Sequence, residues 1–241
     1  MLLTRPAILG ALCWLVAGPL FLAANVMASL GWRDPRFSWA TNNISDLGNV
    51  HCGVWDTTRP RYVCSPWHGP MNAAVILTGI LLAAGILLGW RAAARAASGS
   101  AAAGSAGGSA GARRRPVAAR AAMVLLLFAS VGYGLAGAFP ADVDENSHFL
   151  GALLVLVVGN VGLLVAAFAT RGRARAWTLV AAGVAIAGAV LFFDQQSLGI
   201  GLGAMERLAV FPLPVWACCT GTGLLTAHLA ALAPQYAPAS H

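Results

Sequence analysis

The run Pro6–Leu30, PAILGALCWLVAGPLFLAANVMASL, decides the fold class of this chain because it carries no charged side chain. A helix rises about 1.5 Å per residue, so a run of this length crosses the roughly 30 Å hydrocarbon core of a bilayer. Hydrocarbon offers the backbone no hydrogen-bond partners, which favours a helix over any irregular structure. The run therefore predicts a membrane-spanning helix.

Five further apolar runs follow, at residues 71–90, 121–139, 149–170, 177–193 and 208–233. The chain is 59% hydrophobic and only 10% charged, with a mean hydropathy of +0.74, which excludes an ordinary soluble domain. The alternating pattern of a membrane β-barrel is absent from the sequence. The prediction is an all-α, polytopic integral membrane protein, with residues 1–241 forming one bundle of six transmembrane helices.

A second interpretation of the first run is a cleaved secretory signal peptide. Met1–Arg5 supplies a basic start, and Met27-Ala28-Ser29 supplies small residues near a cleavage point. The apolar run is much longer than a signal core of about 7–15 residues, which favours a permanent span. Cleavage would leave the sidedness of the later segments unchanged.

Two connections between the runs have distinctive compositions. Residues 31–69 form a long polar segment with four tryptophans, a residue type enriched at membrane interfaces, which predicts an outer loop on the membrane surface. Residues 98–112 contain only glycine, alanine and serine, which predicts a disordered cytoplasmic linker. Within the second run, Gly85 and Gly89 match the spacing that lets helices approach closely.

The charges predict the orientation. All 15 basic residues are arginine, and ten of them fall on the inner side if the N-terminus is inside. This bias predicts a protein of the cell membrane with both termini in the cytoplasm. A basic pI can also indicate a nucleic-acid partner. Here the arginines flank apolar runs, so we expect membrane lipids as partners and no nucleic acid.

The five cysteines divide between the outer loop and the spans. Cys52 and Cys64 share the outer loop, where an oxidising compartment favours a disulfide. Cys13, Cys218 and Cys219 lie in apolar runs and are expected to act as small packing residues.

All eight acidic residues lie on the predicted outer side, and several polar residues there stand at the ends of spans. The candidate catalytic residues are Asp46, Asp142, His148 and Glu206, and the candidate ligand-binding residues are Asn42, Ser45, His68 and Arg207. Carboxylates and imidazoles gathered over one mouth can form an acid–base pair. They can also bind a divalent metal, although the sequence has no compact ligand motif and identifies no metal.

Structural interpretations of the same residues stay open. Ser45 and Asp46 can cap a turn that ends at Gly48, and either Asn146 or Ser147 can cap the fourth span. The adjacent Glu206 and Arg207 stand at the entrance to the last span, where ionisable groups indicate a functional site. The alternative is a surface pair that reaches into the headgroups.

Three sequence segments resemble an uncharacterised bacterial family of six-span membrane proteins, known as domain of unknown function 998. They are Ile44-Ser45-Asp46-Leu47-Gly48, Phe139-Pro140-Ala141-Asp142 together with His148, and Glu206-Arg207-Leu208. The likeness covers nearly the whole chain, but the cysteine-bearing loop and the glycine-alanine-serine segment depart from the family pattern. The resemblance implies a six-helix fold and adds weight to Asp46, Asp142, His148 and Glu206, but it implies no activity.

Three functions remain open from the sequence. The first is an enzyme or binding protein for an amphiphilic, lipid-like ligand at the outer interface. The second is a carrier of a small solute or ion, and the third is a non-catalytic subunit whose outer loop docks another protein. Charged residues at the span ends, with no visible inverted repeat, favour the first function over the second.

Overall fold

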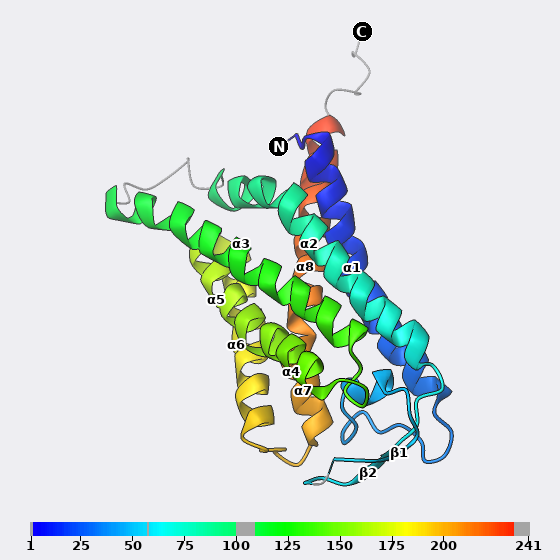
Figure 1. Cartoon of the computed structure of the whole chain (residues 1–241). Coiled ribbons are helices and arrows are strands. Elements are labelled where there is room, and N and C mark those ends of the chain that lie inside the picture. The colour runs from blue at the N-terminus through cyan, green and yellow to red at the C-terminus, as the bar shows by residue number, and fades with distance from the viewer. Residues whose placement is uncertain (1, 57, 100–108, 234–241) are drawn as a thin grey trace.

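The computed structural model of the chain describes residues 2–56, 58–99 and 109–233, and it is an all-α bundle (Figure 1). Within these ranges, six helical segments are long and apolar enough to cross a membrane, as the sequence predicts. Four of them are unbroken or nearly so: α1 (Arg5–Gly31), α2 (His68–Gly99), α3 (Ser109–Ala138) and α6 (Gly172–Phe193).

The other two spans are interrupted helices. The fourth consists of α4 (Glu145–Leu153), a π-helical turn η2 (Leu154–Gly159) and α5 (Asn160–Ala169). The sixth consists of α7 (Leu202–Val210) and α8 (Pro212–Leu232), so it begins earlier than the expected residue 208. Pro212 has no backbone N–H to continue the ladder of α7, which accounts for the break at Phe211.

The segment expected as a linker, residues 98–112, is helical at both of its ends, because α2 continues to Gly99 and α3 begins at Ser109. The rest of that expected linker, residues 100–108, lies outside the described residues.

Close packing of α1 on α2 confirms the role predicted for two glycines. A Cβ atom on Gly85 would collide with the indole of Trp14, and Gly89 lies against Gly10 of α1. Trp14 is fully buried, and its Nε1–H donates to the carbonyl of Leu82 at 3.3 Å. Small residues at this interface therefore make room for a large aromatic side chain in the centre of the bundle.

Residues 32–67, here called the cap, cover one end of the bundle (Figure 1). The cap contains the 3₁₀ turn η1 (Ser45–Gly48) and an antiparallel pair of strands, β1 (Gly53–Trp55) and β2 (Arg61–Val63). The predicted disulfide between Cys52 and Cys64 joins the segments that flank the two strands.

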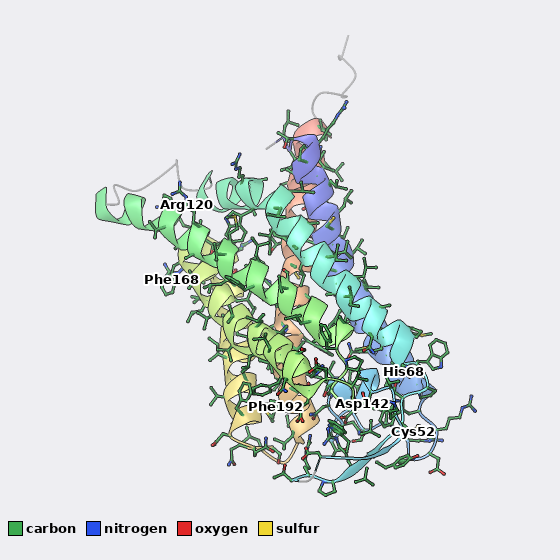
Figure 2. All side chains as sticks on the ribbon, viewed as in Figure 1. Cys52, His68, Arg120, Asp142, Phe168 and Phe192 are labelled. Atoms are coloured by element: carbon green, nitrogen blue, oxygen red, sulfur yellow. A yellow bond between two sulfur atoms is a disulfide. The ribbon has the colours of Figure 1, made fainter. Side chains whose placement is uncertain are left out.

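The start of α1 and the end of α8 lie together at the opposite end of the bundle, where the N–H of Leu3 donates to Nδ1 of His228 at 3.2 Å (Figure 1). Figure 2 shows Cys52 and Asp142 at the cap end and Arg120 near the other end. We call the two ends the cap side and the arginine side.

Candidate functional site

Two neighbouring residues of α7 hold the cap onto the bundle. Glu206 is 8% exposed, and its Oε2 accepts a hydrogen bond of 2.6 Å from the N–H of Ile44. Arg207 is equally buried, and its Nη1 donates to the carbonyls of Trp39, Asn42 and Gly203 at 2.7 to 3.0 Å. Its guanidinium also lies over the Trp39 ring, 4.7 Å from the centroid, in a cation–π contact.

Glu206 and Arg207 do not form the ion pair that the sequence made plausible, since no such contact occurs among the described residues. Consecutive residues of a helix point in different directions, about 100° apart. Arg207 therefore donates hydrogen bonds to backbone carbonyls of the cap. The Glu206 carboxylate has no basic side chain within ion-pair range in the described chain.

Asp46 is completely buried inside the cap. Its two oxygens accept from Nε and Nη2 of Arg61 at 2.7 and 2.6 Å, which is the two-pronged geometry of a strong arginine–carboxylate pair. Asn42 Nδ2 and the N–H of Asn43 donate to the same carboxylate at 3.1 and 2.9 Å. With its oxygens occupied in this way, Asp46 acts as a structural centre of the cap.

Asp142 ties the cap to the connection between α3 and α4. Its carboxylate accepts from the N–H groups of Val50 and His51 at 3.1 and 2.6 Å, and from His51 Nδ1 at 3.0 Å. Burial raises the pKa of Asp142, but these hydrogen bonds outweigh burial and hold the pKa below its ordinary value. Asp142 is therefore a docking residue for the cap.

A cavity of about 70 Å³ lies between the cap and the bundle, and we call it the cap-side cavity. A single water needs about 10–15 Å³ in the same measure, so the cavity has room for several waters or one small polar group. Its polar lining residues are Ser45, Asn72, Tyr133, His148 and Glu206, and its apolar lining includes Phe21, Ile44, Met71, Val75, Val155, Leu156 and Val210.

The exposure of the polar residues shows how the cavity is oriented. Ser45, Asn72 and His148 are partly exposed, whereas Glu206 and Tyr133 are buried. The first three therefore form the mouth, and Glu206 lies in the interior against apolar walls. Part of one wall comes from the π-helical turn η2, a kind of distortion that is frequent at functional sites.

The hydrogen bonds of His148 fix its neutral tautomer. Its Nδ1 lies 2.9 Å from the carbonyl oxygen of Phe139 and 3.2 Å from that of Ala136. A carbonyl oxygen only accepts, so Nδ1 must carry the proton. Nε2 of the neutral ring then keeps its lone pair, and this nitrogen has no partner among the described residues.

The remaining polar groups make the cavity rich in acceptors. The hydroxyl of Tyr133 donates to the carbonyl of Val210 at 3.1 Å, so its lone pairs remain free. Nδ2 of Asn72 donates to the carbonyl of Gly48 at 2.8 Å, so the amide oxygen of Asn72 is left to accept a hydrogen bond. An ionised Glu206 only accepts. The arrangement therefore suits a ligand that donates hydrogen bonds.

Of the eight residues selected from the sequence, the cavity brings together Ser45, His148 and Glu206. Asp46 and Asn42 do not line it; they lie within the cap, where Asn42 Nδ2 donates to the Asp46 carboxylate. The remaining three, Asp142, His68 and Arg207, do not line it; His68 Nδ1 lies 2.9 Å from the carbonyl of Ser65.

Sequence reasoning missed Asn72, Tyr133 and Arg61. Asn72 and Tyr133 are polar residues within apolar runs that also contain Thr78 and Ser130, so the sequence did not distinguish them. Arg61 is one of four arginines in the loop assigned to the outer side, where the positive-inside rule disfavours them. Such a misplaced arginine next to a loop aspartate could have indicated a structural ion pair.

The described residues contain no group of three His, Cys, Asp or Glu side chains that could hold a metal ion. The divalent metal considered from the sequence therefore has no three-ligand site in that part of the chain. Comparison of the chain with protein-family models, with curated proteins and with solved structures gave no match. The resemblance to the six-span family stays a prediction.

Proposed function

We propose that this protein binds the hydrogen-bond-donating head group of an amphiphilic molecule in the cap-side cavity, with Glu206 as the principal anchor. The observation that carries the proposal is a buried carboxylate that faces an acceptor-rich cavity and has no basic partner among the described residues. A primary ammonium group fits best, because it supplies both a positive charge and three N–H donors.

Burial of an ionised carboxylate without a counter-charge costs several kcal/mol, and a bound cation offsets that cost. The cavity is large enough for the end of a head group but not for a chain. The tail of the ligand would remain in the bilayer, beside the exposed apolar side chains of Phe149 and Leu150 on α4. The protein would lie in the cell membrane with both ends of the chain in the cytoplasm, as the arginine bias favours.

An enzyme acting on the head group is the second candidate. It is favoured by the free Nε2 of His148, which could take a proton from a bound hydroxyl or ammonium group. A carrier has less support, since Glu206 and Arg207 are the only charged residues buried in the described spans. An ion crossing the bundle would meet no further charge along that part of the path.

The test uses octylammonium, a primary amine with a short chain, and octyltrimethylammonium, which has the same charge but no N–H donor. Isothermal titration into phosphatidylcholine nanodiscs, corrected for empty nanodiscs, should give at least tenfold tighter binding of octylammonium. Glu206→Gln should lose this preference, and Glu145→Gln, which removes an exposed charge on the same side, should keep it. Equal binding of both amines, or a Glu206→Gln variant that behaves as wild type, would contradict the proposal.

For the enzymatic candidate, His148→Gln should retain octylammonium binding. If the protein turns over an amine-headed lipid, that variant should bind the lipid and fail to convert it.

A further inference from the structure

A second cavity, of about 290 Å³, lies on the arginine side, where α2, α5, α6 and α8 meet. Three tryptophans, Trp90, Trp177 and Trp216, contribute to its lining, with Cys219 and Gly223 of α8. Its volume is close to the lower limit of about 300 Å³ for small-molecule pockets. None of the residues that line it lines the cap-side cavity.

The three threonine hydroxyls that line this second cavity, those of Thr170, Thr178 and Thr220, already donate to backbone carbonyls. Thr178 and Thr220 donate to the carbonyls of Ala174 and Trp216 at 2.8 Å, and the Nε1–H of Trp216 donates to the Thr178 hydroxyl at 3.0 Å. The rest of the lining is mainly apolar. Such a cavity offers little to a polar solute and suits a hydrocarbon chain.

The charge beside the cavity is strongly positive. Arg171, Arg173 and Arg175 flank its lining residues Thr170, Ala174 and Trp177 in the sequence. The eight aspartates and glutamates all lie on the cap side of the bundle, and none of the ion pairs among the described residues includes these arginines. Arg171 is only partly exposed, and its buried Nε has no partner among the described residues.

We propose that the arginine-side cavity binds an anionic phospholipid of the adjacent leaflet. One acyl chain enters the cavity between the tryptophans, and the phosphate lies at Arg171 and Arg173. Basic pockets between transmembrane helices are known to select anionic head groups. The first-turn N–H groups of α6, which no side chain caps, lie next to the same arginines and add donors for the phosphate.

Gly223 provides a variant that fills the cavity without disturbing the helices. A Cβ atom at this position meets nothing within 4 Å, so Gly223→Phe should project into the chain-binding space. Gly183 of α6 is equally open and exposed but does not line the cavity, so Gly183→Phe is the matched control.

The experiment measures quenching of tryptophan fluorescence by phospholipids with brominated acyl chains in nanodiscs. Brominated phosphatidylglycerol should quench wild-type protein and Gly183→Phe more strongly than brominated phosphatidylcholine at the same mole fraction. Gly223→Phe should lose most of that excess quenching. Arg171→Gln combined with Arg173→Gln should reduce the quenching by brominated phosphatidylglycerol to the level of quenching by brominated phosphatidylcholine.

Equal quenching by the two lipids in wild-type protein would overturn the proposal, as would a Gly223→Phe variant that is indistinguishable from Gly183→Phe. Addition of inorganic phosphate distinguishes a lipid site from a simple anion site. Excess quenching that phosphate abolishes at millimolar concentration would show that the head group alone binds, which also contradicts the proposed role of the chain.

Discussion

The Glu206 carboxylate accepts a hydrogen bond from the backbone N–H of Ile44, which lies 162 positions earlier in the chain. The same glutamate lines the cap-side cavity, and Ile44 forms part of the cavity wall. This carboxylate thus holds the cap and is also the one acidic group among the described residues that line the cavity. Ligand binding at Glu206 is therefore expected to be coupled to the position of the cap.

Because Glu206 has both roles, two substitutions at this position are expected to differ in their effect on stability. Glu206→Gln retains a carbonyl oxygen that can accept from Ile44, whereas Glu206→Ala leaves the buried N–H of Ile44 without a partner, at a cost of about 1–3 kcal/mol. We expect Glu206→Ala to lower the free energy of unfolding by that amount relative to Glu206→Gln. Chemical denaturation in detergent measures the difference, and equal stability of the two variants would contradict the fastening role.

Asp46 and Arg61 should behave as a structural pair. Their side chains are 0% and 12% exposed, so Asp46→Asn leaves a largely buried guanidinium with Asp56, 3.1 Å from Nη1, as its remaining carboxylate partner among the described residues. The lost two-pronged pair should lower the free energy of unfolding by about 1–3 kcal/mol. Arg61→Lys should also destabilise the cap, because lysine cannot form two parallel hydrogen bonds, while Arg36→Lys at an exposed position should not.

The readout for this pair is the rate of proteolysis within the cap. An Asp46→Asn variant with a protease-resistant cap that no longer binds octylammonium would show instead that Asp46 belongs to the binding site.

The disulfide between Cys52 and Cys64 closes a short loop around the two strands, with a sequence separation of 12. A loop of that size should stabilise the folded protein by about 3 kcal/mol relative to the reduced form. Replacement of both cysteines by serine should lower the midpoint of thermal unfolding of the cap. Peptide mapping without reductant should find the bridged peptide; two free thiols in oxidised protein would be the opposite result.

Asp142 gives the docking of the cap a dependence on pH. Its pKa is lower in the folded protein than the ordinary value near 4, so the unfolded state binds more protons in this range. The stabilisation that Asp142 gives to the folded state is complete above about pH 4. It is lost as the pH falls through the pKa of Asp142 in the folded protein. Thermal unfolding between pH 3 and 6 should show this loss in wild-type protein and a smaller one in Asp142→Asn.

The sequence was sufficient to predict the six spans and the disulfide because both depend on local signals, apolar length and cysteine placement. It was not sufficient to divide the polar residues among their roles. Asp46 follows one apolar run, and Glu206 precedes another. The Asp46 carboxylate is paired with Arg61, whereas the Glu206 carboxylate faces a cavity. That difference depends on how the cap folds back over the bundle, and no periodicity in the sequence encodes it.

The central claim is that a hydrogen-bond donor binds to Glu206 in the cap-side cavity, which His148 also lines. ¹⁵N NMR of histidine-labelled protein in nanodiscs tests this claim most directly. His148→Gln assigns the two ring resonances of His148. We expect Nε2 to resonate as an unprotonated nitrogen without ligand and to shift when octylammonium is added, whereas Glu206→Gln shows no shift at the same concentration. A protonated Nε2 in the ligand-free neutral ring, or octylammonium binding that leaves both His148 resonances unchanged, would contradict the account.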